Sequence, residues 1–125
     1  MNRPSKDEDR EERIIMDIVV DAYGADERSI SWFYYLDDTL QFPFDGKCKS
    51  ERQISPLKIG DAVVVTGMAD AEECQREMFV TIYWNDTDRV LAIPLSQIDI
   101  VEAEGDETIQ AVGDWHYWTE MGYEF

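Results

Sequence analysis

Two adjacent aspartates, Asp37 and Asp38, are the residues of this sequence whose type and spacing best suit metal chemistry. Two carboxylates about 5 Å apart repel each other by roughly 1 kcal/mol in water and by roughly 3 kcal/mol at an effective dielectric near 20. If a helix ends here, its unpaired carbonyl groups add a negative field of their own. A bound cation would relieve both effects and would gain carbonyl oxygens as further ligands. The alternative interpretation is that both aspartates are solvated and simply stop the helix.

A hard cation is the kind of metal that such groups would bind. Calcium and magnesium prefer oxygen ligands, and this chain offers carboxylates rather than clusters of thiols and imidazoles. The EF-hand pattern is absent at Asp7, Asp37, Asp70 and Asp86. A calcium site would therefore be assembled from separate segments of the chain.

Other acidic residues have simpler explanations. Glu72 and Glu73 are adjacent, and their surroundings are typical of a solvated surface. Asp114 is different because it stands beside Trp115, in an aromatic stretch near the end of the chain. It is either a surface residue or a carboxylate directed at another segment.

The chain as a whole is strongly acidic and has the size of one domain. Of its 125 residues, 28 are acidic and 11 are basic, which gives a formal charge of -17. This balance argues against binding to nucleic acid and to anionic membranes, because both need a basic surface. It favours cations, basic partners or simple solubility. The sequence contains no apolar run long enough to span a bilayer and no secretory signal near Met1, so we expect a cytoplasmic protein.

Residues that could serve catalysis are few and scattered. The single histidine, His116, is distant in sequence from Cys48 and Cys74, and no serine elbow or phosphate-binding glycine loop is present. The two cysteines lack metal-site spacing and indicate free thiols in a reducing compartment. With so many acidic residues, a pair of carboxylates is uninformative as a sign of glycoside hydrolysis. We therefore expect a protein without enzymatic activity.

Hydrophobic periodicity predicts the elements that position these residues. Asp9 is expected to cap a first helix that stops at Gly24, and Asp26 a second one that ends near Leu36. A last helix is predicted over residues 106–121, with Ile109, Val112 and Trp115 in its apolar stripe. The pattern of residues 42–101 predicts four or five short strands, and residues 85–88 are expected to form a hairpin turn between two of them.

These elements predict an α+β fold with two N-terminal helices, a small SH3-like curled antiparallel β-barrel and a C-terminal helix. We expect residues 1–10 to form a flexible N-terminal segment and residues 11–125 to form a single domain. We further expect a monomer.

Several sequence blocks occur in an order that resembles the cyanobacterial calcium-binding protein family. They are residues 18–24 (IVVDAYG), 32–36 (WFYYL), 42–44 (FPF), 54–61 (ISPLKIGD), 65–69 (VTGMA), 77–80 (EMFV), 92–97 (AIPLSQ), 114–118 (DWHYW) and 122–125 (GYEF). The resemblance extends over about residues 11–125, essentially the whole chain.

This resemblance implies a small acidic protein, not of the EF-hand type, that binds Ca²⁺ through surface carboxylates and buffers intracellular free calcium. It points to Asp38, with its neighbour Asp37, as the principal calcium ligand. Asp114, Glu72 and Glu73 are further ligands that it suggests. The alternative function is an acidic protein-interaction module, or nucleic-acid mimic, that binds a basic partner protein.

Overall fold

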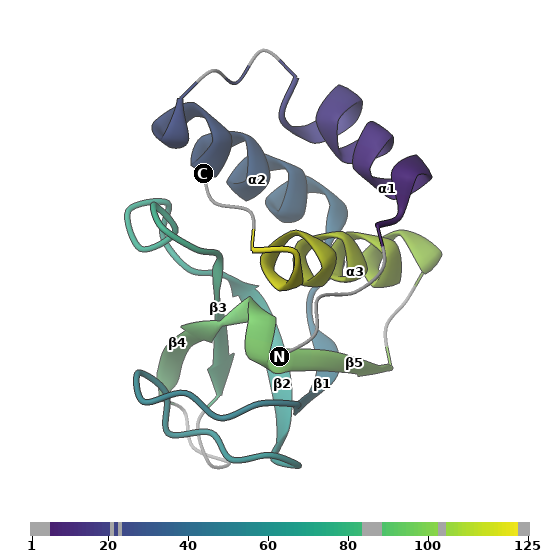
Figure 1. Cartoon of the computed structure of the whole chain (residues 1–125). Coiled ribbons are helices and arrows are strands. Elements are labelled where there is room, and N and C mark those ends of the chain that lie inside the picture. Colours follow the sequence, from purple (N-terminus) through teal and green to yellow (C-terminus); the bar gives the residue numbers. More distant parts are fainter. Residues whose placement is uncertain (1–5, 21, 23, 84–88, 103–104, 123–125) are drawn as a thin grey trace.

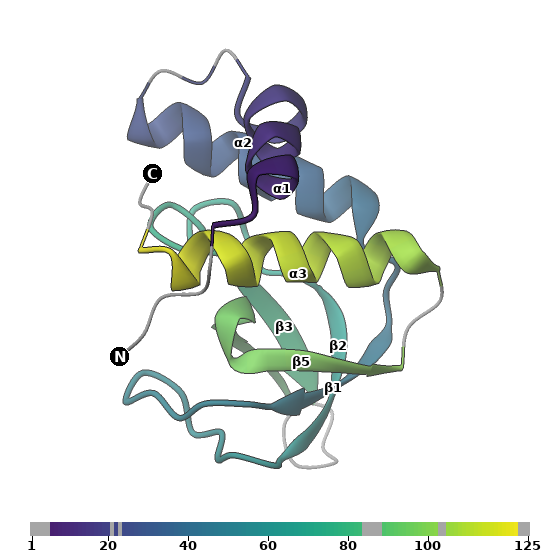
Figure 2. The same ribbon diagram turned by 45° about the vertical axis from the view of Figure 1, so that its right-hand side comes forward.

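The computed structural model describes residues 6–20, 22, 24–83, 89–102 and 105–122. Its helices are stacked on a five-stranded antiparallel sheet, and α3 lies between the sheet and α1 (Figures 1 and 2). The predicted α+β class is thereby confirmed. The predicted hairpin turn at residues 85–88 lies outside the described residues.

The first helical segment consists of α1 (Glu8–Arg13), continued by one π-helical turn, η1 (Ile14–Ile18). Asp7 caps it, because its Oδ1 accepts a hydrogen bond of 3.0 Å from the Arg10 N–H. The expectation that Asp9 is the cap was therefore wrong, and Asp9 lies in the first turn. Helix α1 begins at Glu8, inside residues 1–10, the segment that was expected to be flexible. The boundary between a flexible segment and a single domain at residue 10 stays a prediction.

Helix α2 (Ala25–Thr39) begins one residue before Asp26, which was expected to be its cap, and ends later than predicted. Trp32 and Leu36 are fully buried on one face, at the spacing of about one helical turn. Asp37 and Asp38 therefore lie within the last turn of the helix and not beyond it.

Helix α3 (Asp106–Glu120) matches the predicted range within one residue. Gly105 precedes it with a φ of 82°, a conformation that suits glycine. Ile109 was expected in the buried stripe but is 52% exposed, because the buried face runs through Thr108, Ala111, Val112, Trp115 and Trp118. Trp32 of α2 contacts two of these residues, with ring centroids 5.0 Å from Trp115 and 5.7 Å from Trp118.

The strands are β1 (Phe44–Cys48), β2 (Ala62–Met68), β3 (Phe79–Tyr83), β4 (Val90–Pro94) and β5 (Ile98–Glu102). They form an antiparallel sheet in the order β4-β3-β2-β1-β5. Alternate residues of β1 are buried, as expected for a sheet with one face on the core. Gly46 allows β5 to approach β1 closely, because a Cβ atom there would lie 2.5 Å from Ile98 Cγ2.

The expected SH3-like barrel is not confirmed, because the sheet is not closed. β4 and β5 form its two edges, and no pairing between them occurs among the described residues. A three-residue 3₁₀ turn, η2 (Leu95–Gln97), carries the chain from one edge to the other. The core is covered instead by α3, which packs on η2 and β5. In the part of the chain that the structure describes, no helix has the length and apolar character needed to cross a membrane.

Candidate metal centre

The last turn of α2 presents Asp37 and Asp38 to solvent, and both side chains are exposed. The Leu40 N–H donates to the Leu36 carbonyl at 2.9 Å, which completes the helix. The sequence-based expectation that these two carboxylates share a helix C-terminus is thus confirmed. Because the negative end of the helix dipole lies there, a cation is favoured at this end.

The chain leaves α2 through a hydrogen bond that ties it to α3. The Gln41 N–H would reach the Asp37 carbonyl if the helix continued, but it donates to Thr108 Oγ1 at 3.0 Å. Thr108 is fully buried, so this contact fixes the end of α2 beside the beginning of α3. The Gln41 N–H is thereby taken away from the Asp37 carbonyl, which belongs to the same turn as the two carboxylates. Carbonyl and carboxylate oxygens are ligands of the kind that Ca²⁺ prefers.

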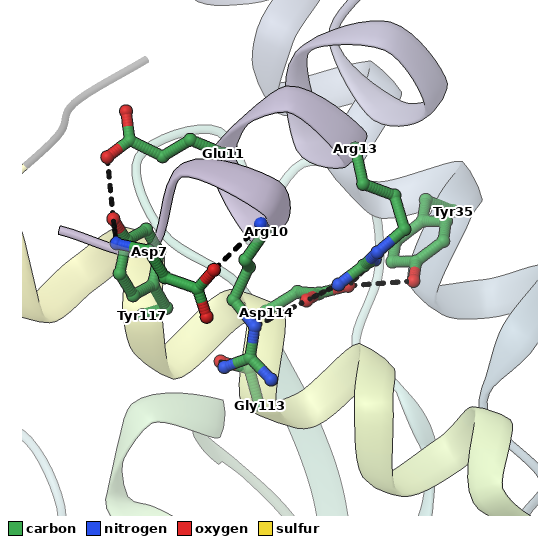
Figure 3. A network of polar contacts seen from close by, with 8 residues as sticks. All are labelled: Asp7, Arg10, Glu11, Arg13, Tyr35, Gly113, Asp114 and Tyr117. Atoms are coloured by element: carbon green, nitrogen blue, oxygen red, sulfur yellow. Dashed lines mark hydrogen bonds and ion pairs between the residues drawn. The ribbon is translucent and has the colours of Figure 1, made fainter.

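Asp114 lies elsewhere, in a buried network between α1, α2 and α3 (Figure 3). Its side chain is fully buried, and its two oxygens accept hydrogen bonds of 2.6 and 2.7 Å from the two Nη atoms of Arg13. Arg10 Nε lies 3.3 Å from Oδ1, and the Tyr35 hydroxyl donates to Oδ2 at 3.1 Å. Of the two interpretations that the sequence left open, Asp114 is therefore a carboxylate directed at other segments and not a surface residue.

The pKa values of Arg13 and Tyr35 reflect their contacts with the buried Asp114 carboxylate. The pKa of Arg13 is raised, chiefly by its hydrogen bonds to Asp114. Burial, followed by the negative charge of Asp114, raises the pKa of Tyr35 to about 12. Both groups thus stay protonated at neutral pH and keep donating to the carboxylate. A metal ion would have to displace two guanidinium groups to reach Asp114.

Glu72 and Glu73 lie in the turn-rich connection between β2 and β3, and both are exposed. The Glu73 N–H donates to the Asp70 carbonyl at 2.9 Å, which holds the turn. Glu72 lines a groove whose other wall includes Asp26, near the beginning of α2. Asp26 and Asp38 are twelve residues apart on one helix, a rise of about 18 Å, so the Glu72–Glu73 pair and the Asp37–Asp38 pair belong to different regions.

The residues predicted as ligands are thus distributed over three places. Among the residues that the structure describes, no group of three or more His, Cys, Asp or Glu side chains converges in a way that could hold a metal ion. Sequence reasoning missed Thr108, which fixes the end of α2, and it missed both arginines that neutralise Asp114. The unusual position of Asp114 among aromatic residues was the one signal for a buried charge.

His116 and the two cysteines have structural contacts. His116 Nε2 lies 3.3 Å from the Leu95 carbonyl oxygen, and its pKa is lowered, chiefly by burial. Cys48 and Cys74 are buried thiols whose pKa values are raised, also chiefly by burial. A raised pKa suppresses the thiolate that nucleophilic chemistry requires. None of the polar contacts found for these three residues joins the imidazole to a thiol.

Comparisons with known proteins relate the whole chain to calcium binding. A family model described as calcium binding, that of the CcbP proteins, matches residues 12–119. The crystal structure of Anabaena CcbP is 41% identical, with a TM-score of 0.86, and the match covers 100% of both chains. A structure of a calcium-binding protein in its calcium-binding form is 40% identical, again with a TM-score of 0.86 and 100% of both chains covered. No curated protein sequence matches the chain.

Proposed function

The chain belongs to the CcbP family of calcium-binding proteins, and we propose that it binds Ca²⁺ reversibly through surface carboxylates and buffers free calcium in the cytoplasm. The observation that carries the proposal is the family match over residues 12–119, together with structural similarity along the entire chain. A formal charge of -17 adds a general attraction for cations.

We assign the principal site to Asp37 and Asp38 at the end of α2. Both carboxylates are exposed, and the hydrogen bond from Gln41 to Thr108 directs the chain away from the carbonyl groups of the last turn. Calcium accepts carboxylate and carbonyl oxygens in irregular arrangements, so ligands from one helix end and from neighbouring segments are compatible with it. The ion would supply the positive charge that this helix terminus lacks.

Glu72 and Glu73 are proposed as a second, weaker site, because they are exposed but lie on a separate loop. The assignment of Asp114 as a ligand stays a prediction, and the contacts favour a different role for it. Its carboxylate is neutralised by Arg13 and Arg10, so it holds α1 against α3.

Sites built from exposed side chains rather than from a rigid loop should bind with dissociation constants of about micromolar to millimolar. That range suits a buffer that takes up and releases the ion. We propose that the protein acts as a monomer. We also propose that it has no catalytic role, since among the described residues no polar contact joins the imidazole of His116 to either thiol.

The decisive experiment is isothermal titration of Ca²⁺ into the protein and into Asp38→Asn and Asp37→Asn variants. Removing a ligand should weaken the principal site by about tenfold or more, because a charged, directly bound oxygen is lost. The control is Asp17→Asn, which removes one exposed charge from η1 and should change the affinity by less than about twofold. Equal affinities for Asp38→Asn and Asp17→Asn would remove the aspartate pair from the site.

A further inference from the structure

A groove lies between α2 and the connection that joins β2 to β3, at a distance from the end of α2. Figure 1 shows this connection extending toward α2. The groove has a volume of about 470 Å³, within the range of ligand-binding clefts. Its lining includes Asp26, Ile30, Phe33, Tyr34 and Glu72.

One wall of the groove is a partly apolar face of α2. Ile30 and Tyr34 are one helical turn apart and therefore share a face. Ile30 is 52% exposed and Tyr34 is 62% exposed, so both offer large apolar surfaces to an incoming group. Phe33 contacts Tyr34 edge to face, with ring centroids 5.7 Å apart, which supports the tyrosine ring from the side.

The charges of the groove have one sign. Asp26 on the helix and Glu72 on the loop contribute a carboxylate from each wall, and both are exposed. Neither lysine nor arginine occurs among the described residues that line it. An occupant that matches both features carries a positive charge toward the two carboxylates and an apolar surface toward Ile30 and Tyr34. An isolated metal ion would contact the carboxylates alone and would leave the apolar surface of Ile30 and Tyr34 uncovered.

Arginine and lysine side chains have this dual character, because an alkyl stem carries a charged end. The stem can lie on an aromatic ring while the cation faces a carboxylate, and a neighbouring apolar residue can cover the aliphatic surface beside it. We propose that the groove is a docking site for a segment of a partner protein in which basic and apolar residues alternate. In this arrangement the basic residue faces Asp26 and Glu72, and the apolar residue covers Ile30 and Tyr34.

The test uses a short amidated, fluorescein-labelled peptide of alternating arginine and leucine, with anisotropy measured at about 0.15 M salt in EGTA. Two control peptides alternate arginine with serine and glutamate with leucine. We expect the arginine–leucine peptide to bind at least about fivefold more tightly than either control, because only it supplies both the charge and the apolar surface. Equal binding of the arginine–leucine and arginine–serine peptides would overturn the proposal in favour of nonspecific electrostatic attraction.

Matched variants locate the contact. Ile30→Ser should weaken the binding of the arginine–leucine peptide by at least about fivefold. Ile109→Ser is its control, because both isoleucines are 52% exposed on a helix and only Ile30 lines the groove. If the two variants bind equally well, the groove is not the docking site.

The two carboxylates of the groove are tested in the same way. A double Asp26→Asn, Glu72→Gln variant should bind the arginine–leucine peptide more weakly than an Asp17→Asn, Glu107→Gln variant, which has the same change in net charge. Equal losses in the two would contradict the assignment. Because the binding is measured without calcium, its outcome is independent of the calcium titration, and either proposal can fail while the other stands.

Discussion

The carboxylate of Asp114 and the guanidinium of Arg13 form a two-point ion pair between residues 101 positions apart, with N–O distances of 2.6 and 2.7 Å. The pair joins the first helix to the last one. Paired, planar contacts of this kind are among the stronger polar interactions in proteins. Arg10 and Tyr35 complete the neutralisation of the carboxylate, so a buried negative charge holds three helices together (Figure 3).

Removal of the Arg13 side chain should therefore destabilise the fold. We expect Arg13→Ala to lower the free energy of unfolding by about 2 to 3 kcal/mol, because Asp114 is left buried with part of its charge unpaired. The expected loss of stability is smaller than for a fully buried ion pair, since 29% of the Arg13 side chain is exposed and Arg10 still contacts Asp114 in the variant. Arg13→Lys should restore little, because an ammonium cannot make the two-point contact. Urea unfolding measures the effect.

The control for this variant is Arg52→Ala. It breaks a pair with Glu77 of similar length, 2.7 Å, whose side chains are 37% and 24% exposed. Its cost should be within about 1 kcal/mol, as for other exposed pairs. Similar losses in Arg13→Ala and Arg52→Ala would mean that the buried pair has no special role.

Tyr35 should make stability fall at alkaline pH. Its pKa in the folded protein is about 12, above the ordinary value of 10.0, so the unfolded chain loses its proton first as the pH rises. The contribution is complete below about pH 10 and declines toward pH 12, by up to about 1.4 kcal/mol per pH unit. Tyr35→Phe should be about 1 kcal/mol less stable at pH 7, because Asp114 loses a hydrogen bond.

This difference between the protein and Tyr35→Phe should shrink and then reverse as the pH rises from about 10 toward 12, since only the protein carries the Tyr35 hydroxyl. Urea unfolding at several pH values measures both curves. All other titratable groups are common to the two chains, so their contributions cancel in the comparison. Parallel curves would show that Tyr35 is not held protonated by its surroundings.

Thr108 should affect both stability and calcium binding. Thr108→Val keeps the shape of the side chain but removes the acceptor of the Gln41 N–H, which should cost about 1 to 2 kcal/mol. Because that hydrogen bond fixes the end of α2, we also expect weaker calcium binding at Asp37 and Asp38. Thr108→Ser retains the hydroxyl and should preserve calcium affinity. Urea unfolding and calorimetry give the two quantities, and an unchanged affinity in Thr108→Val would separate the hydrogen bond from the site.

The proposed calcium sites should discriminate between divalent ions. Magnesium demands near-ideal octahedral geometry and gives up its water reluctantly, so it should compete poorly for irregular carboxylate sites. Affinity for calcium should also fall as salt rises, because part of it arises from the general negative field. Competition titrations at low salt and at about 0.15 M salt test both points. Equal affinities for the two metals would favour a purely electrostatic, acidic interaction module.

Local features of the fold were readable from the sequence. The helix over residues 106–120 was predicted within one residue, because glycines flank a periodic segment. The Asp37–Asp38 pair was placed at a helix end because Pro43 prevents the helix from continuing past it. The prediction of Ile109 as a core residue failed because α3 turns a neighbouring face inward, and that choice depends on the helices packed against it.

Contacts between distant segments were not readable in this way. Periodicity could not show that Asp114 meets Arg13, since the two residues are 101 positions apart and nothing local links them. Closure of the sheet was expected from the number of strands, but it depends on whether β4 reaches β5, which no strand pattern specifies. The calcium ligands were suggested chiefly by the resemblance to a family, because carboxylates are too numerous here to be distinguished one by one.

The contact of Trp32 with Trp115 and Trp118 has a practical consequence. Indole rings this close couple their electronic transitions, so the interface between α2 and α3 should produce a strong near-ultraviolet circular dichroism signal. Any shift of the helix that carries the aspartate pair would change this signal. If calcium binding at the proposed site moves α2 against α3, the change in this signal reports its occupancy without an added dye.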